Sequence, residues 1–202
     1  MKIKKAEYLC SNIDPKLCPK PVFPEYAFIR RSNVGKSSLI NLLVNTHLAK
    51  TSKTPGKTQL INHFLINGNW FLVDLPGYGW AKVSKQHKKK WTNMIKKYLL
   101  ERENLQCVFV LIDSRIPAQR VDLEYFQWLG LSKIPFVIVF TKIDKQSKSK
   151  TLILIDNYIK TMLKTWEEVP EYFLSSTRTE AGKKELLEFI YRINEECKEI
   201  GK

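Results

Sequence analysis

Long apolar segments are missing from this sequence, and no run approaches the roughly 20 apolar residues that a membrane-spanning helix needs. The first residues, MKIKKAEYLCSN, include lysines but no apolar stretch behind them, so we expect no signal peptide. The four cysteines, Cys10, Cys18, Cys107 and Cys197, form no CxxC pair. We therefore expect free thiols in a reduced cytoplasm.

Acidic residues are scarce relative to basic ones. The chain has 20 Asp and Glu against 34 Lys and Arg, which gives a formal net charge of +14. Such a surplus in a small domain points to a polyanionic partner, and nucleic acid is the commonest candidate. With 202 residues, of which 44% are hydrophobic, the chain is long enough to bury the core of one globular domain.

Short apolar runs alternate with segments of helical period. We expect strands at residues 25–29, 59–66, 70–75, 107–113, 135–142 and 172–176, and a first helix at 35–45. Asn67-Gly68 is a strong hairpin signal between the second and third strands. Apolar stripes predict three more helices, around Trp91–Leu99, Leu152–Trp166 (through Ile155, Ile159 and Met162) and Leu186–Ile193.

This alternation predicts an α/β fold with a mostly parallel six-stranded sheet, one antiparallel edge strand, and helices on both faces. Four prolines fall within residues 10–24, so we interpret residues 1–22 as an extended lead-in. A single domain would span 23–198, with a tail at 199–202. Ligands in such folds bind beyond the carboxyl ends of the strands, where the motifs below also fall.

The glycine that opens a phosphate-binding loop is another absence. The segment RRSNVGKS ends like the pattern G-x-x-x-x-G-K-[ST], but Arg30 occupies the first glycine position. The rest fits, because Gly35 allows close approach of the backbone, Lys36 supplies a cation for the β- and γ-phosphates, and Ser37 supplies a hydroxyl for Mg²⁺. Ser38 is a candidate donor to the α-phosphate. The segment follows a strand and opens a helix, as a phosphate cradle requires.

A second motif, DLPG, ends the strand at 70–75. Asp74 is placed to hold a Mg²⁺-bound water, and Gly77 can offer its N–H to a γ-phosphate. In the preceding segment TSKTPGKTQL, Thr58 is a candidate second Mg²⁺ ligand that senses the γ-phosphate, and Thr54 competes for that role. A loop that closes only over a triphosphate would act as a switch.

Two motifs at later strand ends address the base. In FTKID, Asp144 can accept from both guanine N1–H and the exocyclic amine, which adenine lacks, so it would select guanine. The aliphatic stem of Lys142 can lie along the base plane. In LSSTR, Ser175 and Ser176, or their backbone amides, are candidates to reach the base carbonyl.

The strings RSNVGKSSLIN, TPGKTQLINHF, DLPGYGWAKV and TKID together resemble the EngB/YsxC/YihA family of bacterial GTPases. The resemblance runs from about residue 20 to the C-terminus. It implies a Ras-like P-loop GTPase that binds GTP with Mg²⁺ and hydrolyses it to GDP. It also implies a role in assembly of the large ribosomal subunit, with ribosomal RNA as partner, and in normal cell division and septation. We expect a cytoplasmic monomer.

The resemblance maps the nucleotide segments onto residues 30–37, 56–60, 74–77, 141–144 and 174–176. With Ser38, the implied GTP-binding residues are Arg30, Arg31, Ser32, Asn33, Val34, Gly35, Lys36, Ser37, Ser38, Gly56, Lys57, Thr58, Gln59, Leu60, Asp74, Leu75, Pro76, Gly77, Thr141, Lys142, Ile143, Asp144, Leu174, Ser175 and Ser176. It places Mg²⁺ at Ser37 and Thr58, which favours Thr58 over Thr54. The expected catalytic residues are Lys36, Thr58 and Gly77.

Three residues bear on affinity and rate. If the backbone at Arg30 has angles that only glycine adopts easily, the arginine costs about 1–3 kcal/mol and weakens nucleotide binding roughly 5- to 150-fold; alternatively its guanidinium points outward or onto phosphate. On the first reading, Arg30→Gly tightens GDP binding. Tyr78 stands where several GTPases carry a water-orienting glutamine, so we expect slow intrinsic hydrolysis. Asn33 is a candidate K⁺ ligand, the alternative being a residue that stabilises the loop.

Residues 82–97 contain seven lysines and no acid, and Lys145, Lys148 and Lys150 form a second cluster. Both predict salt-dependent affinity for phosphate backbones. Trp80 and Trp91 are candidates to stack on unpaired bases, although burial is the commoner fate of such aromatics. An alternative function is an RNA-binding scaffold whose nucleotide turnover is lost through Arg30. A P-loop kinase is disfavoured, because no lid-like arginine cluster is present and TKID would serve no purpose.

Overall fold

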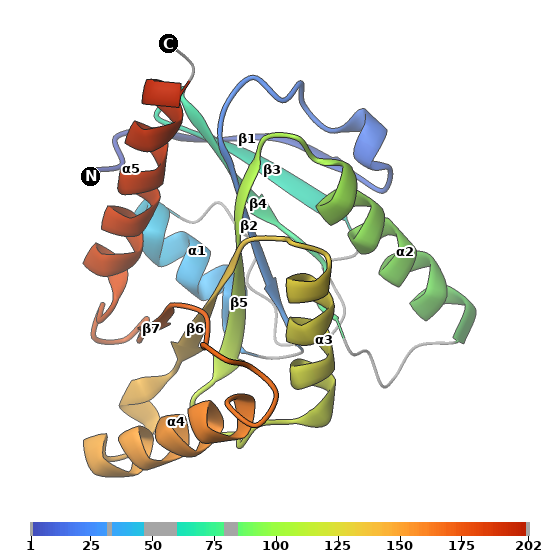
Figure 1. Cartoon of the computed structure of the whole chain (residues 1–202). Coiled ribbons are helices and arrows are strands. Elements are labelled where there is room, and N and C mark those ends of the chain that lie inside the picture. Colours follow the sequence, from blue (N-terminus) through green and yellow to red (C-terminus); the bar gives the residue numbers. More distant parts are fainter. Residues whose placement is uncertain (1, 32–33, 47–59, 79–84, 201–202) are drawn as a thin grey trace.

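The computed structural model describes residues 2–31, 34–46, 60–78 and 85–200. A seven-stranded sheet lies between two layers of helices (Figure 1). The strands are β1 (Ala6–Asn12), β2 (Glu25–Arg30), β3 (Ile61–Ile66), β4 (Trp70–Asp74), β5 (Leu105–Asp113), β6 (Phe136–Thr141) and β7 (Tyr172–Leu174). The helices are α1 (Lys36–Val44), α2 (Lys85–Glu101), α3 (Arg120–Leu131), α4 (Lys148–Met162) and α5 (Lys183–Ile200), with short 3₁₀ turns η1 (Pro15–Leu17) and η2 (Ile143–Lys145).

The strand order is β1-β3-β4-β2-β5-β6-β7. Strands β4, β2, β5, β6 and β7 are parallel, whereas β3 runs antiparallel to both of its neighbours, β1 and β4. The α/β class, the mostly parallel sheet and the helices on both faces are confirmed. The prediction of six strands is wrong, because β1 adds a seventh at the edge. The prediction of one antiparallel edge strand is also wrong, because the antiparallel strand β3 lies inside the sheet, between β1 and β4.

Strand β1 lies within the segment interpreted as an extended lead-in. Its sequence, AEYLCSN, has no apolar run, and its side chains are exposed or only partly buried, so the usual signals of a strand are weak. Contacts distant in sequence hold it in place. Asn67 of the hairpin turn accepts hydrogen bonds at Oδ1 from the amides of Lys4 (2.8 Å) and Lys5 (3.1 Å). Asn67 and Gly68 both have positive φ angles, 51° and 72°, as the predicted hairpin requires.

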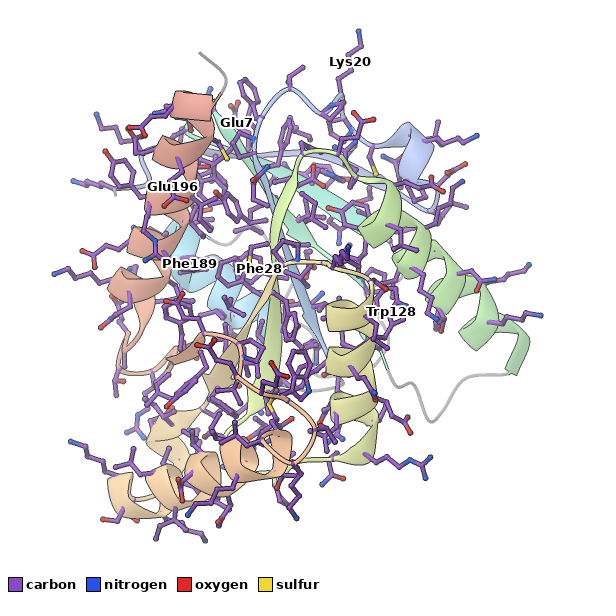
Figure 2. All side chains as sticks on the ribbon, in the orientation of Figure 1. Glu7, Lys20, Phe28, Trp128, Phe189 and Glu196 are labelled. Carbon is purple, nitrogen blue, oxygen red and sulfur yellow. The ribbon has the colours of Figure 1, made fainter. Side chains whose placement is uncertain are left out.

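Each face of the sheet carries its own hydrophobic core. Alternate residues of β5 divide between them: Val108 and Val110 pack under α2, α3 and α4, while Phe109 and Leu111 pack under α1 and α5. On the second face, Phe28 stacks on Phe109 with ring centroids 4.6 Å apart. Phe189 of α5 meets the same ring edge-on at 5.8 Å, and Figure 2 shows Phe28 and Phe189 in this layer. Burial on both faces explains the continuous apolar runs of β5 and β6.

Two helices depart from the sequence patterns. Helix α3 was not among the predicted stripes, although it buries Phe126 and Leu129. In α4 the core-facing positions are Thr151, Ile155, Tyr158 and Met162, a spacing of one helical face. Leu152, predicted to belong to that face, is 49% exposed, because a buried tyrosine and threonine shift the stripe by one position.

A buried polar cluster anchors the C-terminal end of α2. Glu25, at the start of β2, is fully buried and accepts hydrogen bonds from Tyr98 and from Arg102, whose Nη2 lies 2.8 Å from Glu25 Oε2. His63 Nε2 lies 3.4 Å from the same oxygen. Burial alone would raise the pKa of Glu25, but the hydrogen bonds and charges of His63 and Arg102 lower it to about 2. The carboxylate is therefore ionised in the folded protein and holds α2 to the sheet.

Candidate nucleotide site

The loop after β2 leads into α1 through a glycine that has the geometry of a phosphate cradle. Gly35 is the N-cap of α1 and has φ 95°, a left-handed conformation that side-chain-bearing residues rarely adopt. The first amides of α1 are thus left with no capping side chain at Gly35, and the positive end of the helix dipole faces the strand ends. Ser37 lies in the first turn and is half-buried, whereas Ser38 is exposed.

Lys36 and Asp74 meet at the centre of this edge. The Lys36 side chain is 1% exposed, pairs with the Asp74 carboxylate and donates to the backbone oxygen of Leu75. Burial lowers the pKa of Lys36, while the charge of Asp74 opposes that shift. The cation expected to bind phosphate and the carboxylate expected to hold a metal-bound water are therefore adjacent, as the two sequence motifs predict.

Arg30 takes its place without backbone strain. It is the last residue of β2, pairs with Leu111 of β5, and is not among the described residues that combine a side chain with a positive φ. The hypothesis that Arg30 occupies backbone angles that only glycine adopts easily is therefore wrong. The half-buried guanidinium donates to the backbone oxygen of Arg31 at 3.4 Å. Burial lowers the pKa of Arg30 and the nearby charge of Asp74 opposes this, so the guanidinium lies within electrostatic range of the Lys36–Asp74 pair.

The segment after β4 is docked against α3. The Tyr78 amide donates to the Arg30 oxygen at 3.0 Å, and the Tyr78 hydroxyl donates to Asp122 Oδ1 at 2.9 Å. The Tyr78 ring stacks on Tyr125, with centroids 4.2 Å apart and planes at 10°. Arg31 pairs with the same Asp122 at 3.6 Å. Tyr78 is thus buried against α3, and its hydroxyl ties this segment to Asp122.

The base-recognition motif is cross-linked to the phosphate loop. Thr141 Oγ1 donates to the backbone oxygen of Val34, 2.9 Å away. Lys142 has φ 61°, which is uncommon for lysine, and its Nζ pairs with Asp113 Oδ2 at 3.0 Å. Its Cε lies 3.8 Å from the point where a side chain on Gly35 would begin. The Lys142 stem therefore lies beside the phosphate loop, between the two motifs.

Asp113, at the end of β5, is a site residue that the sequence interpretation missed. Besides pairing with Lys142, it accepts two hydrogen bonds of 2.8 and 2.7 Å from the Arg115 guanidinium and one of 3.1 Å from the Arg115 amide. Burial would raise the pKa of Asp113, but the bonds from Arg115 and Lys142 lower it to about 2. Its place at the end of a buried strand was the available signal, but no motif singled it out.

Asp144 is held by Ser176. The Ser176 hydroxyl donates to Asp144 Oδ1 at 2.7 Å and accepts from the amides of Arg178 and Thr179, each at 3.2 Å. This bond is the main reason that the pKa of Asp144 is lowered. The backbone amides of Ser175 and Ser176 are engaged, with Phe140 O at 2.7 Å and Ala181 O at 3.1 Å respectively. Because these two amides already have partners within the chain, the side chains of Ser175 and Ser176 are the stronger candidates to contact the base carbonyl.

Gly182 is a second residue that the sequence interpretation missed. It has φ 79°, and a side chain there would start 2.0 Å from the Leu174 backbone oxygen. Only glycine allows the start of α5 to approach the end of β7 this closely. The close approach positions Ser175 and Ser176 at the strand tip.

Several predicted residues lie outside the part of the chain that the structure describes: Ser32, Asn33, Gly56, Lys57, Thr58, Gln59, and the alternative Thr54. Of the others, Leu60 is exposed before β3, Pro76 is buried, and Gly77, Ile143 and Leu174 are half-buried at the same edge. Within the described ranges, no group of three or more His, Cys, Asp or Glu residues is arranged to hold a metal ion. Ser37 and Asp74 offer the oxygen ligands that Mg²⁺ prefers, and a bound phosphate would have to supply others.

Among the residues described, no helix combines the length and the apolar character needed to cross a membrane. The family profile described as 50S ribosome-binding GTPase matches residues 25–142. A protein of Bacteroides thetaiotaomicron described as a probable GTP-binding protein EngB is 53% identical over 97% of this chain and 98% of its own length. A protein of Flavobacterium johnsoniae with the same description is 56% identical over 97% of this chain and 94% of its own.

Solved structures agree on the fold. The crystal structure of a probable GTP-binding protein EngB superimposes with a TM-score of 0.68 at 22% identity, covering 85% of this chain and 99% of that one. Era in complex with MgGDPNP and nucleotides 1506–1542 of 16S ribosomal RNA gives a TM-score of 0.67 at 25% identity, covering 84% of this chain and 56% of that one. The phosphate cradle, the base motif and the relatives converge: the chain belongs to the 50S ribosome-binding GTPase family, as one of its EngB GTP-binding proteins.

Proposed function

We propose that this protein binds GTP, hydrolyses it slowly to GDP, and uses that cycle as an assembly factor for the large ribosomal subunit, with a consequent requirement in cell division and septation. The observation that carries the proposal is the meeting of two half-sites at one edge of the sheet. Lys36 and Asp74 form the phosphate end, and Asp144 with Ser176 forms the base end. Thr141 and Lys142 connect the two.

At the phosphate end, Lys36 exchanges its ion pair with Asp74 for the β- and γ-phosphate oxygens. The exchange favours a polyanion, because a buried ammonium is stabilised by every added negative charge. The released Asp74 carboxylate would then be free to hold Mg²⁺ through a water, and Ser37 and Thr58 would supply hydroxyl oxygens to the metal. Bound Mg²⁺ would supply charge neutralisation at the phosphates. The amide of Gly77 is the proposed contact to the γ-phosphate.

At the base end, Asp144 accepts from guanine N1–H and from the exocyclic amine. The Ser176 hydroxyl fixes one carboxylate oxygen and lowers the pKa of Asp144. The other oxygen, which lies 3.4 Å from Lys145 Nζ, is the proposed acceptor for the base. Adenine has neither of these two donors at the corresponding positions, so it would leave the carboxylate without partners. The Lys142 stem covers one face of the base.

Slow turnover follows from the engagement of Tyr78 with Asp122, which leaves no side chain at this position to orient water. We propose two sources of acceleration: K⁺ held with the help of Asn33, and a ribosomal partner that completes the site. The cytoplasm is the proposed compartment, and the proposed active form is a monomer with one GTP-binding domain over residues 23–198, to whose sheet β1 adds an edge strand.

Calorimetry with GDP, GTP and ADP tests the site. We expect GDP and GTP to bind and ADP not to bind; Asp144→Asn should lose GDP and gain xanthosine diphosphate, because xanthine carries an oxygen where guanine carries the amine. Absence of GDP binding at millimolar concentration would instead support the alternative, an RNA-binding scaffold without nucleotide turnover.

Phosphate release in potassium against sodium buffer, with and without large-subunit particles, tests the catalytic proposals. We expect the rate to rise in potassium and again with particles. Equal rates in all four conditions would remove both proposed sources of acceleration.

A further inference from the structure

A pocket of about 270 Å³ lies between α2, α3 and the segment that follows β4. It is lined by Trp91 and Ile95 of α2, by Tyr125 and Trp128 of α3, and by Gly77 and Tyr78. Pockets that hold whole small molecules typically have about 300–1,000 Å³. The space therefore suits one planar ring system inserted from a larger partner. Of its lining residues in the described part of the chain, Gly77 and Tyr78 are the ones that also border the nucleotide site.

The walls of the pocket are aromatic. Tyr78 and Tyr125 stack in parallel, and the Trp128 ring lies 5.8 Å from Tyr125 at 33°. Trp128 is half-buried on the side of α3 that faces α2 (Figure 2). Lys96 Nζ of α2 stands over the Trp128 ring, 5.1 Å from its centroid. The pocket therefore combines aromatic walls with a cation that lies over one face of Trp128.

The charge around the pocket selects the partner. Lys89, Lys90 and Lys96 are exposed on α2, and the helix has no acidic residue before its last position, Glu101. The acidic residue at the pocket, Glu124, is paired with Arg120 at 2.6 Å. A nucleobase on a phosphate backbone could therefore contact both the aromatic walls and the lysines. A peptide without acidic residues would contact only the apolar walls.

We infer that this pocket receives one unpaired RNA base, stacked on Trp128, with the neighbouring phosphates on the lysines of α2. The inference rests on the proposed function, in which the partner is a ribosomal particle, and it names the element of RNA that is recognised. Unpaired bases are the part of folded RNA that protein aromatics can reach. Because Gly77 and Tyr78 line the pocket, nucleotide state and base affinity are coupled, and each changes the other by the same factor.

The test measures affinity for a labelled single-stranded RNA of about ten nucleotides, and for an abasic ribose-phosphate chain of equal length, at one salt concentration. Trp128→Leu should weaken binding of the RNA by about 5- to 150-fold, the range for loss of one stacked base, and leave binding of the abasic chain unchanged. Trp128→Phe, which keeps an aromatic face, should recover most of the affinity. Tyr191→Leu removes an exposed ring from α5, on the other face of the sheet, and should have no effect.

Failure of the wild-type protein to bind the RNA better than the abasic chain overturns the inference, and so does an equal loss for both ligands in Trp128→Leu. If Trp128→Leu loses affinity for large-subunit particles but not for RNA, the occupant is a protein side chain and the RNA assignment is wrong. GDP binding of each variant, measured in the same buffer, separates the two proposals: if GDP still binds, only the pocket assignment fails, whereas absence of GDP binding in the wild type removes the proposed function. RNA affinity that is equal with GDP and with a non-hydrolysable GTP analogue refutes the coupling.

Discussion

Replacing Ser176 by alanine tests how the base end is organised. The hydroxyl donates to Asp144 at 2.7 Å and accepts from two backbone amides, so Ser176→Ala removes three hydrogen bonds at once. A hydrogen bond to a charged group contributes about 1.5–3 kcal/mol. Asp144 is partly open to solvent, which screens the bond, so we take the lower end of that range. The expected loss of GDP affinity is then about 10-fold, from about 1.4 kcal/mol per factor of ten.

The assay compares GDP with inosine diphosphate, whose base lacks the exocyclic amine and offers Asp144 only one donor. The wild type should prefer GDP, and Ser176→Ala should reduce that preference because the carboxylate is no longer oriented. The same variant should raise the pKa of Asp144 towards its ordinary value, since the bond from Ser176 is the main cause of its lowering. Loss of GDP binding on acidification should therefore begin at a higher pH.

Thr177→Ala is the matched control. Thr177 is the exposed neighbour of Ser176 and is not one of the predicted site residues, so removal of its hydroxyl should change neither the affinity nor the preference. Equal losses in Thr177→Ala and Ser176→Ala, or wild-type affinity and preference in Ser176→Ala, would refute the positioning role. Thermal denaturation of both variants distinguishes a local effect on the base end from general loss of stability.

Four further outcomes are expected. Arg30→Gly should lower the free energy of unfolding by about 0.5–1 kcal/mol, the cost of glycine in a strand, and should not tighten GDP binding, because the backbone holds no glycine-only angle; a fivefold tightening by calorimetry would contradict this. Gly182→Ala should cost more than about 2 kcal/mol and impair GDP binding, since its side chain would meet the Leu174 oxygen at 2.0 Å; wild-type denaturation and affinity would count against the close approach. Glu25, with a folded pKa of about 2 against an ordinary 4.5, contributes about 3 kcal/mol above pH 4.5 that is lost as the pH falls towards 2, so Glu25→Gln should flatten the acid limb of a stability–pH curve; a parallel limb would remove the assignment. Neutralising Lys88–Lys90 with glutamine should weaken binding to ribosomal particles and reduce its salt dependence, and unchanged binding would exclude this segment from the contact.

The sequence predicts the fold, and brings the candidate site residues to light, where chemistry and local pattern coincide. Strand ends, the phosphate loop and the FTKID motif are local, and the structure brings Lys36, Asp74 and Asp144 to one edge as those motifs indicate. What the sequence leaves out depends on contacts between distant residues. Strand β1 is held by the turn at Asn67, and Gly182 matters only because β7 lies against it.

The sequence also does not predict which partners an individual side chain contacts. The position of Tyr78 suggested an absence of catalytic help, but its engagement with Asp122 and Tyr125 required the packing of α3, a helix that no pattern singled out. The consequences of Arg30 likewise depended on a backbone angle that no sequence pattern specifies.

The buried carboxylate at the foot of α2 has a mechanical consequence. The C-terminal end of helix α2 is held by Tyr98 and by Arg102 just beyond it, and Met94 and Ile95 pack into the core nearer its middle. A helix of 17 residues is about 25 Å long, so a tilt of about 10° about its C-terminal end would move its first turn by about 4 Å. The lysine-rich turns lie towards the end that such a tilt moves farthest. A tilt of this size would change where the helix presents its positive charge to a partner.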